Sequence, residues 1–298
     1  MLARMPSPRV VVILNPASGR GAGGAAESKI RAALDGIGCP DAEIWKTSHS
    51  GHAVDLAQEA VSNGVERICA AGGDGTVAEV LRGMFGSGAV LGIIPVGTGN
   101  DFVRTIGIPK DIEKAVEIAV KGDAKPVDVG QVNGLPFINL CACGFDAVVG
   151  ERINKGFKYL RGTAAYIAAV FTTLVKFKAS NFRVEVDGQV HESRAMLCCV
   201  ANAMCYGGGM MVAPMANVSD GQFDVVMVEE VGKIQALALF SKVFKGGHIG
   251  DPKVKTYKGS QVKISCEPPL PVLCDGELIG PAPAEFVMCS ERVLVAMP

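Results

Sequence analysis

The sequence predicts an α/β protein of two domains: an N-terminal doubly wound α/β domain and a C-terminal, mainly antiparallel β-sandwich with inserted helices. The chain has 298 residues, more than a single hydrophobic core usually holds. In its first part strands alternate with helices, which is typical of a parallel sheet covered on both faces. After Lys125-Pro126 strand follows strand. We therefore expect domains of residues 1–125 and 126–298.

The N-terminal part consists of apolar runs separated by amphipathic segments. Val10–Leu14 is continuous, apolar and mostly β-branched, the pattern of a buried parallel strand. Ligands of such sheets gather beyond the carboxyl ends of the strands. In chain order, the expected strands are 9–14, 44–47, 65–71 and 90–95, and the expected helices are 25–34, 51–63, 77–84 and 112–120.

The turn after the third strand, Gly72-Gly73-Asp74-Gly75-Thr76, holds three glycines around one acid. Glycines let backbone N–H groups approach a phosphate, and the next helix offers its N-terminus to the negative charge. A bare Gly-Gly pair would be an ordinary strand-to-helix turn. The carboxylate of Asp74 favours a bridging cation, so the pattern indicates a nucleotide phosphate and a metal ion.

Two more glycine-bearing loops follow predicted strands, at residues 15–21 and 96–101. The first lacks the Lys-Ser/Thr ending of a Walker motif and is weak evidence alone. All three loops fall at carboxyl ends of strands, and this convergence is stronger than any single loop.

The C-terminal part reads as strands with Gly-containing turns and two helices. Asp220-Gly221 and Asp275-Gly276 are most simply hairpin turns. Glu277, directly after the second, could project into a cleft between domains and take a proton from a hydroxyl that attacks a phosphate. The expected strands are 127–132, 135–141, 182–186, 195–203, 222–228, 261–266 and 287–296, the helices 160–178 and 234–244, and the turn signals Asn133-Gly134 and Asp187-Gly188.

Composition excludes several classes. The net charge is −1 without a basic run, so nucleic-acid binding has no electrostatic support. The ten cysteines are scattered or lie in apolar runs without zinc-type spacing, as expected of reduced, buried thiols. Residues 1–9 do not resemble a signal peptide, and the apolar stretch 163–175 is shorter than the about 20 residues that span a bilayer. We expect a cytoplasmic protein, with peripheral contact at the inner face of the membrane left open.

A set of motifs in fixed order resembles the bacterial diacylglycerol kinase and lipid kinase family, whose catalytic domain is shared with sphingosine and ceramide kinases. Gly-Gly-Asp-Gly alone also occurs in NAD kinases and phosphofructokinases, but the segment at 97–102 with the late Asp-Gly-Glu is specific. The resemblance runs from Val10 to the C-terminus. Its motifs are Asn15-Pro16-x-Ser18-Gly19, Gly72 to Thr76, Gly97-Thr98-Gly99-Asn100-Asp101-Phe102-x-Arg104, Asp128-x-Gly130, Ser219-Asp220-Gly221 and Asp275-Gly276-Glu277.

The resemblance implies roles for individual residues. Glu277 matches the proton acceptor, with Asp275 beside it, and Asp74 completes the catalytic set. Asp74, Asp101 and Asp128 match acids around a catalytic Mg²⁺, held largely through waters. Asp220, with backbone oxygens of Asn217 and Gln222, matches a second, structural metal site. The ATP positions are Asn15, Pro16, Ser18, Gly19, Thr47, Gly72, Gly73, Asp74, Gly75, Thr76, Val77, Ala78, Thr98, Asn100 and Asp101.

Some positions keep a second interpretation. Ala78 stands where many members of the family carry Asn. Glu79 fits a helix surface as well as a functional role, Arg104 fits an ion pair with a neighbouring acid better than a phosphate anchor, and His248 fits loop ordering better than proton chemistry.

We expect an ATP-dependent lipid kinase that phosphorylates a lipid hydroxyl such as that of diacylglycerol, giving phosphatidic acid. The alternatives are a kinase of a sphingoid-type lipid or NAD, and a nucleotide-binding module without catalysis. The expected partner is a lipid at a membrane surface, not nucleic acid, and a homodimer stays open. Apolar surface on helices 160–178 or 234–244 would touch the bilayer, although packing of both helices on the sheets explains them equally well.

Overall fold

The computed structural model describes residues 9–154 and 163–298. The expectation about residues 1–8 and the first three residues of the expected helix 160–178 lie outside this part. The chain divides into two compact units. The first comprises the residues up to Val129 together with Ser290–Pro298, and the second is Gly130–Cys289.

The sheet of the N-terminal unit has the strand order β2-β1-β3-β4-β19-β5. Its first four strands are mutually parallel and match the expected strands: β1 (Val10–Leu14), β2 (Glu43–Lys46), β3 (Arg67–Gly72) and β4 (Val90–Pro95). The fifth, β19 (Val293–Met297), comes from the end of the chain. It lies parallel to β4 and antiparallel to β5 (Asp123–Val127).

The predicted division of the chain into residues 1–125 and 126–298 was wrong at the C-terminal end. Residues 290–298 belong to the N-terminal unit, because β19 fills the place between β4 and β5. The single strand expected at 287–296 is two strands of different sheets, β18 (Ala284–Met288) and β19, separated by the polar residues 290–292.

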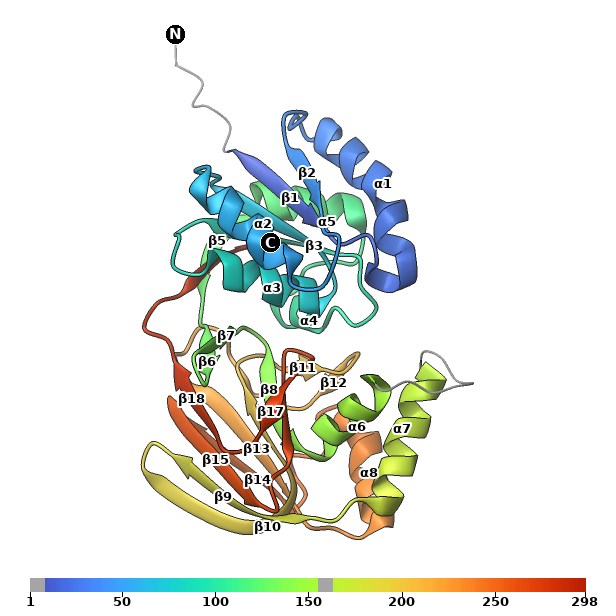
Figure 1. Ribbon diagram of the computed structural model, residues 1–298, viewed down its shortest axis with the longest axis vertical. Coiled ribbons are helices and arrows are strands. Elements are labelled where there is room, and N and C mark those ends of the chain that lie inside the picture. Colours follow the sequence, from blue (N-terminus) through green and yellow to red (C-terminus); the bar gives the residue numbers. More distant parts are fainter. Residues whose placement is uncertain (1–8, 155–162) are drawn as a thin grey trace. The chain divides into compact units, whose positions relative to one another are not determined.

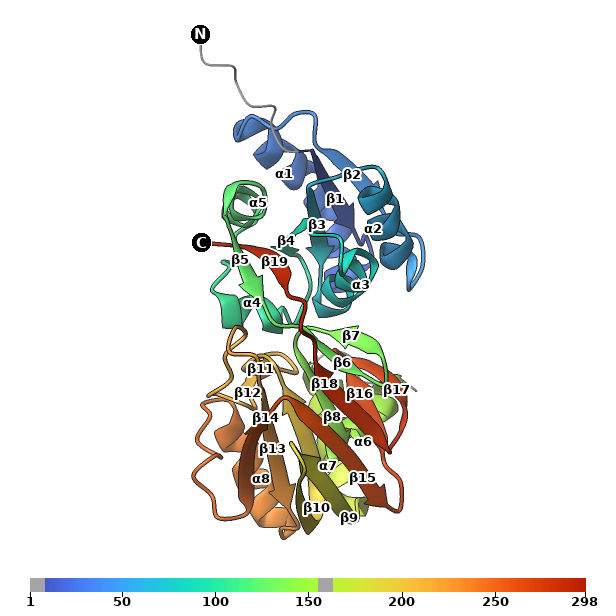
Figure 2. The same cartoon turned by 90° about the vertical axis from the view of Figure 1, so that its left-hand side faces the viewer.

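Helices cover both faces of the N-terminal sheet, so the doubly wound arrangement is confirmed (Figure 2). On one face α1 (Ala22–Gly36) and α5 (Ile112–Lys121) bury Ile30 and Val116 in a cluster with β1 residues. The other face carries α2 (His52–Ser62) and α3 (Asp74–Met84). Two short helices lie in the loops: η1 (Ser18–Gly21) after β1 and α4 (Asp101–Ile106) after β4.

The C-terminal unit is built on an antiparallel sheet, as expected. The long strand β10 organises it: its first half pairs with β9, and its second half lies between β8 and β13. The strands are β6 (Gly130–Val132), β7 (Leu135–Phe137), β8 (Leu140–Gly144), β9 (Ser180–Val186), β10 (Gln189–Ala201), β13 (Phe223–Glu229), β14 (Val254–Gly259), β15 (Gln261–Glu267), β16 (Pro271–Cys274), β17 (Glu277–Pro281) and β18, with a small pair β11 (Cys205–Tyr206) and β12 (Met210–Met211).

Three two-residue hairpin turns set the register of this sheet. Asn133-Gly134, Asp187-Gly188 and Asp275-Gly276 each join neighbouring antiparallel strands, and both residues of every pair have positive φ. Two positive φ angles define the type I′ turn, for which Asn-Gly and Asp-Gly are the preferred sequences. These three turn signals are therefore confirmed. Asp220-Gly221, also expected as a hairpin turn, instead lies in the loop before β13 and joins no pair of the described strands.

Three helices accompany this sheet: α6 (Phe145–Asn154), α7 (Thr163–Lys176) and α8 (Lys233–Val243) (Figure 1). The sequence predicted α7 and α8 but not α6, which directly continues the apolar run of β8. No helix in the described ranges is long and apolar enough to cross a membrane. All ten cysteines lie in the described ranges and none forms a disulfide; seven of them are buried.

Candidate active site

The carboxylate of Asp74 connects two of the glycine-bearing loops. Its Oδ1 atom accepts the backbone N–H of Asp101 at 2.7 Å and of Phe102 at 3.2 Å. Asp74 is the first residue of α3 and Asp101 the first of α4, so one carboxylate oxygen satisfies two free donors at the start of α4. The turn after β3 and the turn after β4 are thus fixed to each other.

The third loop, after β1, is joined to the same place through Asn15. The Asn15 side chain donates from Nδ2 to Thr76 Oγ1 at 3.1 Å and accepts the N–H of Ala17 at Oδ1 at 3.0 Å. Thr47, at the end of β2, donates its N–H to the carbonyl of Leu14 at 2.9 Å. The segments after β1, β3 and β4 are therefore hydrogen-bonded to one another, and the residue after β2 is hydrogen-bonded to the end of β1.

Close backbone packing explains two of the glycines. A Cβ atom on Gly97 would overlap Gly73 Cα, and a Cβ atom on Gly72 would overlap the Thr76 side chain. Asn100, with φ 52°, closes its own turn by donating from Nδ2 to the Gly97 carbonyl at 2.8 Å. The loops leave room only for backbone, which is the arrangement that lets N–H groups approach a phosphate.

The other residues predicted to bind ATP differ in how far they are exposed to solvent. Thr98 is exposed, whereas the side chains of Val77 and Ala78 are buried in the core on α3. Pro16, Ser18, Gly19 and Gly75 are half-buried and open to solvent on one side. Backbone groups of this stretch, rather than the side chains of Val77 and Ala78, are available to a ligand.

The Asp74 and Asp101 carboxylates face a common point. A Cβ atom built on Gly99 would lie 2.8 Å from Asp74 Oδ2 and 3.3 Å from Asp101 Oδ2, so both oxygens border the same small space. Mg²⁺ is usually held by one or two carboxylates, waters and substrate phosphates. The two acids fit that donor set. Within the described ranges no three His, Cys, Asp or Glu side chains are grouped to hold a metal ion by themselves.

Asp128 has a different environment from the other two acids. Its carboxylate is almost fully buried, and Oδ1 lies 2.7 Å from Nε of Arg292 in an ion pair between the end of β5 and the start of β19. The structure thus shows a contact that fixes the last strand. A role of Asp128 at Mg²⁺ stays a prediction.

A lysine of β14 (Val254–Gly259), Lys258, faces the segment expected to hold a second metal ion. Asp220 Oδ2 lies 2.7 Å from Lys258 Nζ, which is also 3.9 Å from Asp224 Oδ2. Asp220 Oδ1 accepts the N–H of Gln222, and Asn217 Oδ1 accepts the N–H of Ser219. Burial raises the pKa of Asp224, while Lys258 opposes that rise. An ammonium group therefore faces these two carboxylates, and metal binding here stays a prediction.

In the C-terminal unit, Asp275 and Glu277 lie on either side of Gly276 in the β16–β17 turn. The buried Asp275 carboxylate accepts three backbone N–H groups, from Ile138 at 3.0 Å, Asn139 at 3.1 Å and Leu140 at 3.2 Å. It fixes the turn to the segment before β8. Glu277 begins β17 and is half-buried. Asp275 thus positions the turn that presents Glu277.

For three residues the sequence allowed both a structural and a functional role, and the structure shows the contacts of each. Glu79 accepts the N–H groups of Gly51 and Ala53 at the start of α2, and Arg104 Nε lies 3.8 Å from Asp101 Oδ1. His248 Nε2 lies 3.0 Å from the Val212 carbonyl and holds a loop, as expected. Sequence reasoning missed the partners Arg292 and Lys258, because each pairs with an acid far away along the chain.

The fold and its loops define the class: an α/β unit with three glycine-bearing loops at the ends of its strands, and an antiparallel β unit inserted before the last strand of the first. Comparison with known proteins is consistent with this. Residues 9–132 match the diacylglycerol kinase catalytic domain model, and residues 139–297 match the YegS C-terminal NAD kinase beta sandwich-like domain model.

Known proteins and one crystal structure are similar to this chain over nearly its whole length. The chain is 32% identical over 293 residues to a diacylglycerol kinase of Bacillus subtilis (strain 168), covering 97% of this chain and 96% of that protein. It is 33% identical over 300 residues to a diacylglycerol kinase of Mycobacterium tuberculosis, covering 97% and 95%. The crystal structure of a diacylglycerol kinase from Bacillus anthracis str. Sterne superposes with a TM-score of 0.78 at 27% identity, covering 99% and 98%. The chain belongs to the bacterial diacylglycerol kinase family.

Proposed function

We propose that this protein is an ATP-dependent lipid kinase that transfers the γ-phosphate of ATP to the hydroxyl of diacylglycerol, giving phosphatidic acid. The observation that carries the proposal is the Asp74 carboxylate, which fixes two glycine-bearing loops together at the ends of β3 and β4. The diacylglycerol kinases above match nearly the whole chain, which supports diacylglycerol over the alternatives of a sphingoid-type lipid or NAD.

The N-terminal unit supplies the phosphate donor's site. Backbone N–H groups of the three loops and the N-terminus of α3 neutralise the triphosphate. Asp74 and Asp101 would hold Mg²⁺ through Oδ2 and waters, and the ion would neutralise charge on the phosphate oxygens. Asp74 Oδ1 keeps its hydrogen bond to the start of α4. The same side chain would therefore bind the metal ion and hold the loop after β4.

The C-terminal unit supplies the base. The lipid hydroxyl gives its proton to the Glu277 carboxylate as its oxygen bonds to the γ-phosphorus, and the bond to the β-phosphate oxygen breaks to release ADP. Transfer of a phosphoryl group needs mainly positioning and charge stabilisation. Asp275 contributes by holding the turn through its three N–H bonds.

The test compares Glu277→Gln with Glu285→Gln in mixed micelles containing ATP, Mg²⁺ and diacylglycerol. Glu285 is an exposed glutamate on β18 that pairs with Lys263, so it controls for loss of a charge. We expect Glu277→Gln to lower kcat by about 10²–10⁴-fold with an unchanged melting temperature, and Glu285→Gln to leave kcat unchanged. Parallel assays offer a sphingoid base and NAD as acceptors.

Three results would overturn the proposal. Phosphorylation of NAD or a sphingoid base in preference to diacylglycerol would show that the protein is a kinase of that acceptor. ATP binding without transfer to any acceptor would favour a module without catalysis. Full turnover by Glu277→Gln would remove Glu277 as the base.

We also propose peripheral membrane contact through α7, α8 and the residues that follow them. Large apolar side chains are exposed there, with Val175 at 61% and Ile234 at 86%, beside Phe171 and Phe244. The sequence has no acidic residue between Glu151 and Glu185 or between Glu230 and Asp251. Apolar side chains next to uncompensated lysines fit the surface of an anionic bilayer. The exposed lysines are Lys176, Lys178, Lys233, Lys242 and Lys245.

Vesicle co-sedimentation tests this contact. Phosphatidylcholine vesicles with added anionic phosphatidylglycerol should retain the protein, and salt should weaken the binding. Each lysine near the surface is worth about 1 kcal/mol, so Lys233→Gln with Lys242→Gln should weaken binding more than tenfold. Ile234→Gln should weaken it as well, while Val190→Gln, at an exposed apolar residue of β10, should not. Unchanged sedimentation of the Ile234 and lysine variants rejects the contact.

A further inference from the structure

Two cysteine side chains from distant strands meet in the core of the C-terminal unit. Cys143 lies on β8 and Cys266 on β15, and their sulfur atoms are 4.0 Å apart. Each strand pairs with other neighbours, β8 with β10 and β16, and β15 with β9 and β18. The contact is therefore made by side chains inside the unit, where Cys143 belongs to an apolar cluster and Cys266 packs against it.

The backbone of Leu270 gives the two sulfur atoms different surroundings. Its N–H donates to Cys266 Sγ at 3.3 Å, whereas its carbonyl accepts from Cys143 Sγ at 3.9 Å. A donor favours the thiolate form of a sulfur, and a carbonyl acceptor favours the protonated thiol. The hydrogen bond between the two sulfur atoms lowers the pKa of Cys266, against the effect of burial, and raises the pKa of Cys143. Cys266 is therefore the sulfur that reacts as a thiolate.

Exposure distinguishes the two cysteines in the same way. Cys266 is half-buried, so a small reagent can reach it, whereas Cys143 is fully buried. Cys198 lies directly opposite Cys143 on β10, but it is fully buried too, and burial raises the pKa of its thiol. An accessible thiolate next to a second, protonated thiol is the arrangement of redox-sensitive cysteine pairs.

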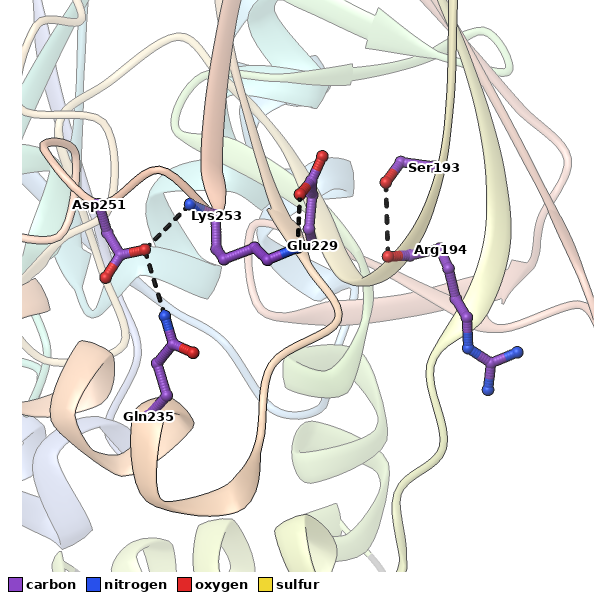
Figure 3. A network of polar contacts seen from close by, with 6 residues as sticks. All are labelled: Ser193, Arg194, Glu229, Gln235, Asp251 and Lys253. Carbon is purple, nitrogen blue, oxygen red and sulfur yellow. Dashed lines mark hydrogen bonds and ion pairs between the residues drawn. The ribbon is translucent and has the colours of Figure 1, made fainter.

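The strands beside Cys143 are braced by polar contacts. Lys253 Nζ lies 3.2 Å from Glu229 at the end of β13, and the Lys253 N–H donates to Asp251, which also accepts a hydrogen bond from α8 (Figure 3). β13 pairs with β10, and β10 pairs with β8, which carries Cys143. Cys266 is the second-last residue of β15, just before the connection to β16. A disulfide needs sulfur atoms about 2.05 Å apart, so the Cys266 end of β15 would make most of the approach.

We propose that Cys266 and Cys143 form a peroxide-reactive dithiol, in which Cys266 is oxidised first and Cys143 then closes a disulfide. The Cys266 thiolate attacks one oxygen of hydrogen peroxide, the O–O bond breaks, and hydroxide leaves a sulfenic acid behind. The Cys143 sulfur attacks the Cys266 sulfur, the S–O bond breaks, and the departing hydroxide takes the Cys143 proton to become water. The first hydroxide becomes water with the proton that Cys266 lost on ionisation. The two thiols lose two electrons in all, and the peroxide is reduced to two waters.

The bond would link two strands that the chain connects only over a long distance. Cys143 and Cys266 are 123 positions apart, and a cross-link between distant residues restricts the unfolded chain more than one between near residues. Oxidation should therefore raise the melting temperature by about 5 °C or more. Small thiols reverse such a bond by exchange. None of these steps involves ATP or an acceptor lipid.

The test maps the oxidised thiols by mass spectrometry. Reduced full-length protein is treated with hydrogen peroxide, its remaining thiols are blocked with N-ethylmaleimide, and the protein is digested. We expect the peptides of Cys143 and Cys266 to be joined, and to separate again after dithiothreitol. Cys39, which is half-buried in the other unit, should be oxidised about tenfold more slowly than Cys266.

Variants separate the two roles. In Cys143→Ala the sulfenic acid on Cys266 has no partner, so dimedone should label it, whereas Cys39→Ala should form the disulfide as wild type does. Cys266→Ser should form neither a disulfide nor a dimedone adduct at Cys143. If Cys143→Ala does not fold, Cys266→Ser and the wild-type cross-link still decide the question.

Four results would overturn the proposal. They are a link from Cys143 to Cys198, the absence of any link under conditions that oxidise Cys39, dimedone labelling of Cys143 in Cys266→Ser, and an unchanged melting temperature of the cross-linked protein. The expected cross-link, its loss in both Cys143→Ala and Cys266→Ser, and the raised melting temperature would together support it.

Discussion

Asp275 and Asp187 occupy the same position of the same type of turn, yet their carboxylates are placed differently. Both have positive φ, and both accept backbone N–H groups from another segment of the C-terminal unit. Asp275 is buried, whereas Asp187 is exposed. Water can replace a lost carboxylate at Asp187 but has little access at Asp275, so the same substitution should have different costs.

We predict that Asp275→Ala lowers the free energy of unfolding by about 3 kcal/mol or more, because three buried N–H groups lose their acceptor. Asp187→Ala should cost about 1 kcal/mol. Urea unfolding of both variants measures this. Equal losses in the two variants would show that burial does not govern the cost. Activity of Asp275→Ala should fall with its stability, whereas Glu277→Gln should lose activity at unchanged stability.

Asp146 is a buried acid, and no basic side chain is among the groups that shift its pKa. Burial raises its pKa from 3.8 to about 6, with Cys199 as its side-chain hydrogen-bond donor. A raised pKa in the folded state favours the protonated acid. The stability that the protonated Asp146 carboxyl contributes is therefore fully present below about pH 4 and is lost as the pH rises through about 6.

We predict that Asp146→Asn is as stable as wild type at pH 4 and more stable at pH 8. Asn keeps the shape of the protonated acid but does not ionise. The raised pKa of Asp146 corresponds to a gain in the free energy of unfolding of up to about 3 kcal/mol at pH 8. Chemical unfolding at both pH values measures the difference. The same gain at pH 4 and pH 8 would contradict burial of the charge as its cause.

At the scale of single residues, the sequence named the acids but not their partners. Asp74, Asp101 and Asn15 could be placed in loops at the ends of neighbouring strands from the motifs alone. The assignment of Asp74 Oδ1 to the start of α4 depends on how two turns pack, which spacing does not encode. Arg292 lies more than 150 positions after its partner Asp128, and no local pattern joins them.

At the scale of elements, the Lys258 side chain holds the start of β13 to β14. It pairs with Asp220 in the turn before β13 and lies near Asp224 within that strand. Asp224 is buried whereas Asp220 is exposed, so without the ammonium group the buried Asp224 carboxylate would lose its nearby cation and face a second carboxylate.

We predict that Lys258→Met lowers the free energy of unfolding by about 1–2 kcal/mol, a value reduced for the partial exposure of Lys258. Added Mg²⁺ should then raise the melting temperature of this variant more than that of wild type, since a cation can take the place of the ammonium group. Lys263→Met, which removes an exposed pair with Glu285, should change stability by less than about 0.5 kcal/mol and show no Mg²⁺ effect. Identical responses of the two variants would contradict a special role for Lys258.

Elements with strong local signals were predictable, and those set by tertiary pairing were not. The four parallel strands and the three Asp-Gly or Asn-Gly hairpins followed from β-branched runs and turn residues. Helix α6 was missed because its residues continue the apolar run of β8 without a break. The division of the expected strand 287–296 into β18 and β19 was missed because both halves are apolar and only their pairing partners differ.

At the scale of the whole molecule, the chain returns to its first unit at the end. β19 lies between β4 and β5, and Val293 pairs with Val127 in the antiparallel direction. Without β19 the edges of both neighbours would be exposed and Asp128 would lose Arg292. The C-terminal unit is therefore an insertion between two adjacent strands of the N-terminal sheet, although sequence order suggests two successive domains.

This topology predicts which fragments fold. Residues 1–129 alone should be unfolded or aggregate, because they lack β19, the strand that joins β5 to the rest of the sheet. Because Val127 and Val293 are paired neighbours, a short Gly-Ser turn that replaces residues 130–289 should join β5 to β19 as a hairpin and give a cooperatively folded N-terminal unit. Circular dichroism and urea unfolding measure both fragments. The joined fragment should also bind ATP with Mg²⁺, measured by calorimetry, since its loops are complete. A folded fragment 1–129 with the same stability as the joined one would show that β19 is dispensable.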